Sequence, residues 1–430
     1  MRPPLRARSE KHKKEQNRGK PQRFTPVSLE PMKAGGLRNG GRDMNDDRLQ
    51  KIIDLRHTLH QYPELSMEER ETMRRIKAFL RENTGAVIVD REGWFYAVLP
   101  GSDPEASAIA FRADMDALPI REPDGVPYAS VHDGVSHKCG HDGHCAALCG
   151  LAMALEDCEH SRTVYLIFQP GEEIGAGGEL CAGLLREKEI AEVFAFHNLS
   201  GYPEGALVYR NGLTCPASEG LTVRLHGEQS HASYPEAGNN PAAAVSRVAL
   251  FSQTLAERPH DGMALCTVAG IRVGAGDFGI SPGEGELCLT LRAERETEMK
   301  RMERELLRYA AEQAEAAGLS MDCQTCDCFP ETRNHGESVQ RVLRCAKAQG
   351  IPAIEMEQLW RPSEDFGHYL KECPGALVFI GNGTDWPPLH TVEYDFNDRI
   401  LPAAIRLFSG LCVSARPPRV RQKTGAASFA

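Results

Sequence analysis

The chain has 430 residues, of which 41% are hydrophobic and 26% are charged. This is the composition of a globular protein that is long enough for two domains. No apolar run approaches the roughly 18 residues that a membrane-spanning helix needs, and the basic N-terminus lacks the apolar segment of a secretory signal. We therefore expect a cytoplasmic protein without a membrane partner, in which the 14 cysteines are mostly reduced.

The net charge of −10 is unevenly distributed along the chain. Residues 1–43 contain 12 Lys and Arg against four Asp and Glu, an excess of +8, so the remainder carries −18. An acidic body argues against nucleic acid as a partner. Residues 1–45 and 414–430 show no hydrophobic periodicity, and we expect a disordered basic extension and a disordered tail there.

The first elements predicted after the basic extension are two helices. Apolar residues over 49–59 follow helical spacing, and Tyr62-Pro63 ends that helix. Ser66 followed by Glu69 is the pattern of a capping box, which predicts a second helix that runs to about Asn83.

Short apolar runs rich in β-branched and aromatic residues predict strands at Ala86–Val89, Trp94–Leu99, Ala108–Phe111, Thr163–Gln169, Val193–Phe196 and Ala376–Ile380. Three of these runs continue into segments with metal-competent residues: Arg112–Pro119, Pro170–Glu173 and His197-Asn198. Because α/β sheets build sites at the carboxyl ends of their strands, we expect these segments to meet. Asp116 is expected to orient a metal-bound imidazole by accepting its second N–H, rather than to bind the metal itself.

The stretch His137–His144, with the sequence HKCGHDGH, carries the densest set of metal-binding side chains. It contains a thiol, three imidazoles and a carboxylate in what we expect to be one loop, followed by a helix over Ala146–Leu155. The two glycines free the backbone to turn sharply, so Cys139 and His141 can point at one spot. Cys and His are preferred ligands of zinc-like ions, while the alternative is a polar loop with surplus histidines.

Two other groups of metal-competent residues have ordinary interpretations. His57 and His60 come late in the first predicted helix and are expected to be surface or helix-terminal histidines. Cys323, Cys326 and Cys328 resemble a zinc knuckle, but no fourth ligand lies nearby in the sequence. We expect reduced thiols in an edge strand there.

From about Ser218 the pattern changes to strands and helices in alternation, which predicts a second, compact α/β module. Its expected strands are Leu221–Leu225, Leu265–Val273 and Glu286–Arg292, and its expected helices are Pro241–Leu255 and Glu296–Ala316. A last helix, over Arg399–Leu411, follows the return to the first domain.

Seven spaced motifs occur in the order HxxPELS at His60–Ser66, RADMDALP at Arg112–Pro119, HKCGHDGH at His137–His144, QPGEE at Gln169–Glu173, GxxxHA at Gly227–Ala232, SEDF at Ser363–Phe366 and HTxxYDF at His390–Phe396. Together they resemble the M20 metallopeptidase family, and more narrowly its aminoacylase-like amidohydrolase branch. That branch includes N-acyl-amino-acid amidohydrolases, hippurate hydrolases and auxin-conjugate hydrolases. The resemblance covers nearly all of residues 46–413.

The resemblance implies a site with two divalent metal ions, and the mixed thiolate, imidazole and carboxylate donors favour Mn²⁺, Zn²⁺ or Co²⁺. Carried over by position, Glu172 would be the general acid/base, and the ligands would be Cys139, His141, Glu173, His197 and His390. Two adjacent ions would polarise an amide carbonyl and generate hydroxide near neutral pH. One carboxylate must stay free to take the proton of the water and pass it to the leaving amine.

The resemblance also assigns residues of the second module. His231 would reach into the active site of the partner subunit and stabilise the oxyanion, which implies a homodimer. The alternative is a surface histidine in a turn. Arg292 matches the family's substrate-binding arginine, suited to a bidentate grip on a carboxylate. The family's usual Asn-Val-Ile-Pro is here Gly279-Ile280-Ser281-Pro282, so the polar side chain expected at Gly279 is missing.

These features lead us to expect an α/β fold with two domains. A mixed-sheet, aminopeptidase-like catalytic domain would span residues 46–216 and 328–413, and a smaller α/β lid or dimerisation domain would be inserted over 217–327. The expected function is metal-dependent hydrolysis of the amide bond of N-acyl amino acids or similar conjugates. The alternatives are a dipeptidase with the same site, a hydrolase with Cys139 as its nucleophile, and a catalytically silent metal-binding protein. Neither of the last two gives a role to Glu172.

Overall fold

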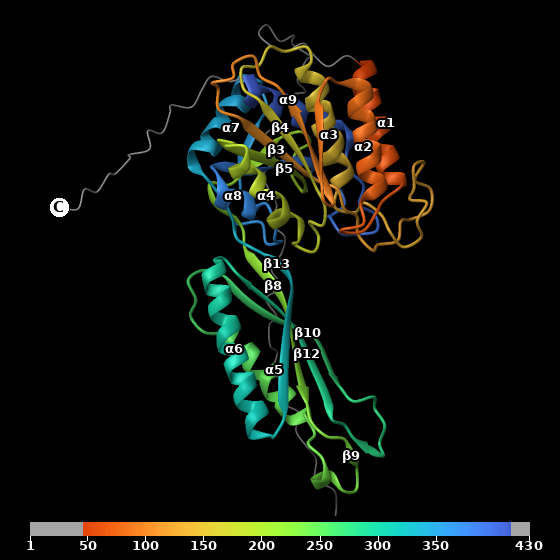
Figure 1. Ribbon diagram of the computed structural model, residues 1–430, viewed down its shortest axis with the longest axis vertical. Helices are drawn as coiled ribbons and strands as arrows, with labels where there is room; N and C mark the ends of the chain where they lie inside the picture. The colour runs from red at the N-terminus through yellow and green to blue at the C-terminus, as the bar shows by residue number, and fades with distance from the viewer. Residues whose placement is uncertain (1–45, 414–430) are drawn as a thin grey trace, which may run out of the picture. The chain divides into compact units, whose positions relative to one another are not determined.

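The computed structural model describes residues 46–413, so the disorder predicted for 1–45 and 414–430 lies outside the described residues. Within this range the strands form two larger sheets and two small two-stranded sheets, with helices packed on them (Figure 1). The predicted α/β fold with one large mixed sheet and a smaller α/β unit is confirmed, whereas the domain boundaries stay predictions. None of the helices between residues 46 and 413 is long and apolar enough to cross a membrane.

The large sheet has eight strands and is mixed. In spatial order they are β1 (Val87–Arg91), β2 (Trp94–Leu99), β4 (Val164–Gln169), β3 (Ile109–Asp114), β5 (Glu192–Ser200), β16 (Gly375–Gly383), β6 (Leu207–Tyr209) and β15 (Ala353–Glu355). The four central strands β4, β3, β5 and β16 are parallel to one another. Their carboxyl ends therefore meet at one edge of the sheet, where α/β proteins place their sites.

Helices cover both faces of the large sheet. One face packs against α1 (Asp46–Gln61), α2 (Arg70–Asn83), α3 (His141–Leu155), α7 (Gly336–Ala348) and α9 (Leu401–Val413), and the other against α4 (Gly177–Glu187) and α8 (Gly367–Glu372). Helix α3 contacts α1, α9 and β3 (Figure 1). A Cβ atom at Gly143 would lie 2.3 Å from the Phe396 ring, so glycine permits this close packing beside the metal motif.

The second sheet has four strands in the order β10 (Ala264–Val273), β12 (Glu284–Ala293), β8 (Ala217–His226) and β13 (Ser320–Phe329). Burial alternates along β12, and Leu287, Leu289 and Leu291 point into the core. Helices α5 (Ala242–Ala256) and α6 (Glu296–Ala316) contact this sheet and share its core. The strands and helices predicted for the second module are all present, and α6 has the predicted bounds. As predicted, β13 is an edge strand.

Two short pairs complete the described strands: β9 (Ser230–His231) with β11 (Ile280–Ser281), and β7 (Gly212–Cys215) with β14 (Thr332–Asn334). Helices α4, α7 and α8 and the short strands were not predicted from the sequence.

The predicted capping box is wrong. Helix α2 begins at Arg70, and its N-cap makes no side-chain hydrogen bond. The Ser66 hydroxyl instead donates to Asp116 Oδ2 at 2.7 Å, and Glu69 accepts a hydrogen bond from the Gly171 amide at 2.7 Å. Both side chains therefore form hydrogen bonds with segments that follow strands of the large sheet, rather than with the N-terminus of the helix.

The expectation for His60 is only half confirmed, because the residue lies in the last turn of α1 as expected but is fully buried rather than on the surface. Its Nδ1 is 2.8 Å from Asp142 Oδ2, and its Nε2 is 2.8 Å from Glu122 Oε1. His57 is half-buried, and its ring stacks on Tyr128 with centroids 3.7 Å apart. A helix position that faces the core can carry histidine here because two carboxylates meet the ring.

Candidate metal centre

The motif HKCGHDGH is half loop and half helix. Residues 137–140 form the loop, and α3 begins at His141, five residues earlier than predicted. Gly140 has φ +101°, in the left-handed region that favours glycine, and a Cβ atom there would lie 2.3 Å from Asn198 Oδ1. The turn at Gly140 places Cys139 at the end of the loop and His141 on the first turn of the helix.

The structure brings the five predicted ligands together. Cys139 Sγ lies 3.3 Å from Nε2 of His197 and 3.3 Å from Nε2 of His390. Glu173 Oε1 lies 3.8 Å from His141 Nε2 and 3.5 Å from His390 Nε2. His197 is part of β5 and does not follow it, because the strand continues to Ser200. The cluster therefore forms at the carboxyl edge of the large sheet, as expected.

The donor atoms of the cluster fit divalent metal ions. Three overlapping sets each bring their ligand atoms within 4.8 Å of one another: Cys139, His141 and His197; Cys139, Glu173 and His390; His141, Glu172 and Glu173. Among the residues that the structure describes, none offers a hydrogen bond to the buried atoms His141 Nε2 and Glu173 Oε1. Buried polar atoms normally have a partner, so these two indicate that something else binds there.

The electrostatics of the cluster also favour added positive charge. Burial lowers the pKa of His141, but the carboxylates of Asp114 and Asp116 outweigh burial and raise it to about 10. Burial and nearby carboxylates raise the pKa of the Cys139 thiol well above its usual range. A metal cation would take the place of the proton at both groups, and the same carboxylates would stabilise its positive charge. A neutral, buried thiol argues against Cys139 as a nucleophile.

Glu172 lies beside the ligand atoms, with its Oε2 3.9 Å from His141 Nε2. The side chain is buried, and its carboxylate is within 4.8 Å of those of Glu364 and Asp365. Burial and these carboxylates, together with Glu173, raise the pKa of Glu172 well above its usual range. A carboxyl group with a raised pKa is suited to accept and return a proton near neutral pH.

Asp116 lies against His141, but the carboxylate that we expected to accept the second N–H of the ring makes no hydrogen bond to it. Its main-chain carbonyl accepts a hydrogen bond from His141 Nδ1 at 2.8 Å, and its Oδ1 is 3.2 Å from the same nitrogen. Oδ2 accepts from the Glu173 amide at 2.9 Å. Contacts at Nδ1 leave Nε2 facing the cluster, which is the orientation that a metal-binding imidazole needs.

Asp114 and His144 are close to the cluster but were given no role in the sequence analysis. His144 Nδ1 is 2.5 Å from Asp114 Oδ1, and its Nε2 is 2.7 Å from Asn198 Oδ1. Asp114, His141 and His144 bring three ligand atoms within 4.8 Å of one another. The missed signal is the spacing of the two histidines, since residues i and i+3 share one face once the helix starts at His141.

A buried arginine balances part of the acidic charge. Arg112 on β3 lies 2.6 Å from Asp114 Oδ2, 2.6 Å from Asp365 Oδ1 and 3.0 Å from Glu364 Oε1. One guanidinium does not offset the mutual repulsion of these carboxylates, and burial together with the neighbouring carboxylates raises the pKa of Glu364 and Asp365 as well as that of Glu172. A bound cation would relieve this repulsion, which is a second reason to expect cations in the cluster.

The two predicted residues of the second module lie apart from these contacts. His231 is exposed on β9, and its Nδ1 accepts from the Ser233 amide at 3.0 Å. Arg292 on β12 donates to the carbonyl of Arg361 at 2.9 Å and to the Ser363 hydroxyl at 2.6 Å, and no carboxylate of the described residues pairs with it. Gly279 is exposed, next to Phe278, whose side chain is fully exposed.

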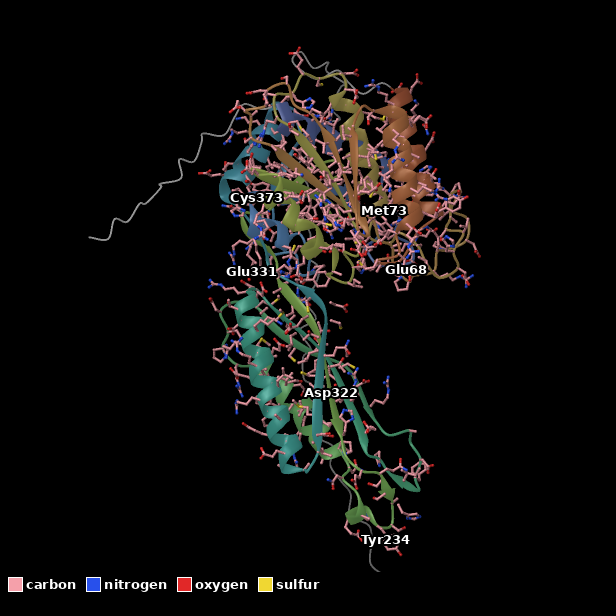
Figure 2. The ribbon with its side chains drawn as sticks, viewed as in Figure 1. Glu68, Met73, Tyr234, Asp322, Glu331 and Cys373 are labelled. Carbon is pink, nitrogen blue, oxygen red and sulfur yellow. The ribbon has the colours of Figure 1, made fainter. Side chains whose placement is uncertain are left out.

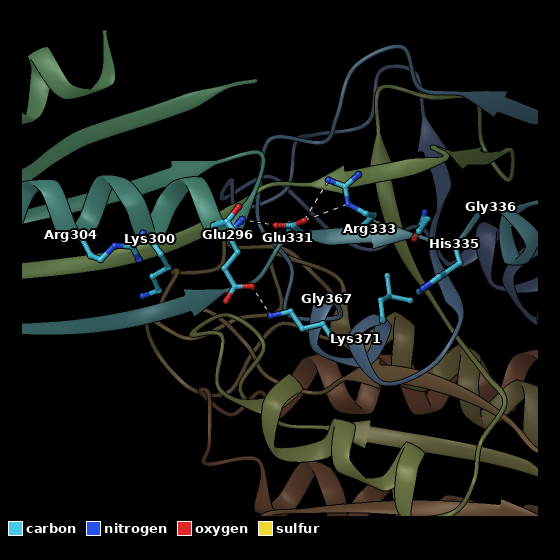
Figure 3. A pocket seen from close by; sticks show the side chains of 12 residues that line it. Glu296, Lys300, Arg304, Glu331, Arg333, His335, Gly336, Gly367 and Lys371 are labelled. Carbon is cyan, nitrogen blue, oxygen red and sulfur yellow. Dashed lines mark hydrogen bonds and ion pairs between the residues drawn. The ribbon is translucent and has the colours of Figure 1, made fainter. Parts of the chain in front are cut away.

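A cavity of about 760 Å³ lies elsewhere, and none of the predicted site residues lines it. Its charged lining comes from Glu296, Lys300, Arg304, Glu331, Arg333 and Lys371 (Figure 3). Lys371 pairs with Glu296 at 2.6 Å, and Lys300 pairs with Glu219 and with Glu303. Most of its charges are therefore already paired within the chain.

Cys323, Cys326 and Cys328 are exposed on β13 and take part in none of the ligand groups found between residues 46 and 413. All 14 cysteines lie in the described range and are free thiols.

Comparison with known proteins agrees with this geometry. The model of peptidase family M20/M25/M40 matches residues 110–414. An N-acetylcysteine deacetylase of Bacillus subtilis is 30% identical over 372 residues, which cover 84% of this chain and 96% of that enzyme. A hippurate hydrolase of Campylobacter jejuni is 29% identical, with 84% and 95% covered.

A solved structure gives the same picture. The crystal structure of the Bacillus subtilis YXEP protein, a dinuclear metal binding peptidase from the M20 family, superposes with a TM-score of 0.72 at 27% identity, and covers 86% of this chain and 98% of that one. The chain belongs to peptidase family M20/M25/M40.

Proposed function

We propose that the protein is a metal-dependent amidohydrolase that cleaves the amide bond of N-acyl amino acids. The observation that carries this proposal is the buried cluster of Cys139, His141, Glu173, His197 and His390, with Glu172 beside it. Relatives that span most of the chain are named as an N-acetylcysteine deacetylase, N-acetyldiaminopimelate deacetylases and a hippurate hydrolase, all of which act on N-acylated amino acids.

In this proposal the five clustered side chains hold two divalent ions, with Asp116 fixing the ring of His141. The mixed thiolate, imidazole and carboxylate donors suit Zn²⁺, Mn²⁺ or Co²⁺ better than Mg²⁺ or Ca²⁺. When bound, such ions polarise an amide carbonyl and lower the pKa of a water molecule.

Glu172 takes the proton from the attacking water at its carboxylate and returns it to the nitrogen of the leaving amine. The burial of Glu172 and its neighbours keeps bulk water away from this transfer. Arg292 would bind the carboxylate of the amino-acid part of the substrate, because its guanidinium has no acidic partner among the described residues.

His231 would stabilise the oxyanion in the active site of a partner subunit, which makes the working enzyme a homodimer. Support for this role comes from the exposure of His231 on the short β9–β11 pair, where a second copy can reach it. We also propose a cytoplasmic location, which the free cysteines support.

The test of the proposed function is metal-restored turnover on a panel of substrates. Metal-free protein would be supplied with Mn²⁺, Zn²⁺ or Co²⁺ and assayed against acetyl and benzoyl amino acids and against dipeptides. We expect hydrolysis of N-acyl amino acids only after metal is added. Hydrolysis confined to dipeptides would replace the proposal by a dipeptidase, and no hydrolysis with metal bound would contradict it.

A further inference from the structure

Lys138 is an unusual residue for the centre of a metal-binding motif. It lies between His137 and Cys139, and its side chain is only 1% exposed. A buried ammonium group is costly unless charged and polar partners surround it. The partners of Lys138 therefore indicate what the residue does.

The ammonium group of Lys138 joins two distant segments. Nζ donates to Glu122 Oε1 at 2.7 Å and to the main-chain carbonyl of Tyr394 at 2.8 Å. The main-chain carbonyl of Lys138 accepts from the His390 amide at 2.7 Å. Lys138 is thus bonded to both ends of the segment 390–394, which closes on itself through a hydrogen bond from the Tyr394 amide to the Thr391 carbonyl at 3.1 Å.

Of the proposed ligands, His390 depends most on contacts from other segments to hold it in position. Its side chain is 51% exposed, and its φ of +61° lies in the left-handed region that non-glycine residues rarely adopt. The residue lies in a turn rather than in a helix or strand. Its Nε2 nevertheless lies 3.3 Å from Cys139 Sγ, so an outside contact must hold the turn in place.

Glu122 supplies the negative charge that keeps Lys138 in place. Besides Lys138 it contacts His60 Nε2 at 2.8 Å, and its Oε2 accepts from the Ser130 amide at 2.8 Å. Burial raises the pKa of Glu122, but the bonds to His60 and Lys138 outweigh burial and lower it to about 2. Glu122 is therefore ionised whenever the protein is folded near neutral pH.

We infer that Lys138 is a positioning residue that ties the turn 390–394 to the Cys139 loop, so that His390 and Cys139 reach the same metal ion. This inference rests on the proposed function, because it assumes that both residues are metal ligands. Residues that support metal ligands in this way typically change metal affinity about 10–100-fold when they are removed.

The test is metal binding by Lys138→Met, which keeps an unbranched side chain, one atom shorter than lysine, and removes its donor. Metal-free protein would be titrated with Co²⁺, with the bound ions counted by mass spectrometry and the thiolate–cobalt absorption recorded. We expect one of two ions to bind about 10–100-fold more weakly than in the wild type. Lys77→Met is the matched control, because it removes a surface ion pair with Asp90 at 2.7 Å and should leave both ions unaffected.

A double-mutant cycle separates positioning from general damage. If Lys138 acts through His390, Lys138→Met should weaken metal binding little further once His390→Ala is present. Additive losses, or two tightly bound ions in Lys138→Met, would overturn the inference. Should circular dichroism find Lys138→Met unfolded, Lys138→Leu, which also lacks a donor, takes its place in the cycle with the same criteria. A wild-type protein that binds no ion would instead contradict the proposed function.

Discussion

Histidines and carboxylates meet on both of the larger sheets, and the two groups differ in burial. On the four-stranded sheet, His226 lies 2.6 Å from Glu284 and 2.6 Å from Asp322, which is labelled in Figure 2, and both carboxylates are exposed to solvent. Both ring nitrogens of His226 have a partner. At the edge of the large sheet, buried atoms of His141 and Glu173 have no hydrogen-bond partner among residues 46–413. The candidate site is therefore distinguished by buried polar atoms that lack a hydrogen-bond partner, and not by its residue types.

The largest expected effect is a loss of turnover when the glutamate beside the proposed ligands is replaced. A surface glutamate on the other sheet serves as the matched control. Glu172→Gln should lower kcat about 10²–10⁴-fold, because the amide cannot take the proton from water. Bound metal and thermal stability should stay at wild-type values. Glu286→Gln, in a surface pair with Arg224, should leave kcat unchanged. If both variants had the same kcat, the buried cluster and the exposed cluster would not differ in function.

The aspartates that contact histidine provide the next comparison. Asp116→Asn should weaken metal binding about 10–100-fold, since it disturbs the contacts that orient His141. Asp322→Asn changes a contact of His226 and should not alter metal binding. Competition with a chelator measures both affinities. An unchanged affinity in Asp116→Asn would show that the ring of His141 is oriented without the carboxylate.

Arg292 tests whether the four-stranded sheet contributes to function. Arg292→Gln should raise KM about 10–100-fold with a smaller change in kcat, because a hydrogen bond to a charged group contributes about 1.5–3 kcal/mol. Arg272→Gln on the same sheet, in an exposed pair with Glu286, is the control. If both variants keep the KM of the wild type, the substrate carboxylate is bound elsewhere.

The smallest expected effect is a pH dependence of stability. Burial lowers the pKa of His60, but hydrogen bonds with Asp142 and Glu122 outweigh it and raise the pKa above 6.5. The stabilisation that protonated His60 gives to the folded protein is therefore complete below about pH 6.5, and it is lost as the pH rises through the raised pKa.

Urea unfolding over a pH series checks this dependence. The free-energy difference between wild type and His60→Gln should be larger at about pH 6 than at about pH 9. His226→Gln should show a smaller dependence of stability on pH, because the carboxylates that pair with His226 are exposed to solvent. A difference for His60→Gln that does not vary with pH would mean that folding leaves the pKa of His60 unshifted.

The parts of the molecule that followed from the sequence are those with local causes. Helix α6 has its predicted bounds because Met299, Met302, Leu306 and Ala310 repeat on one buried face. The alternation of β12 is equally local. The proposed ligands were named from the motif resemblance, and their residue types chemically suit a shared metal site.

What the sequence did not reveal depends on contacts between distant segments. Helix α4 was missed because Gly175–Gly178 resembles a loop, yet a Cβ atom at Gly177 would lie 1.6 Å from the Pro170 carbonyl oxygen. Glycine is present there for close packing rather than for flexibility. Ser66 and Glu69 fit a local capping pattern, but the partners that meet them come from Asp116 and Gly171. No local pattern reveals such partners.

The most direct test of the central claim is the metal content of three proteins: wild type, His197→Ala and His226→Ala. Each would be loaded with Mn²⁺, Zn²⁺ or Co²⁺, freed of excess metal, and measured by mass spectrometry. We predict two ions per chain in the wild type and in His226→Ala, and at most one in His197→Ala. A wild type without bound ions, or two ions in His197→Ala, would contradict the assignment of the buried cluster as a two-metal site.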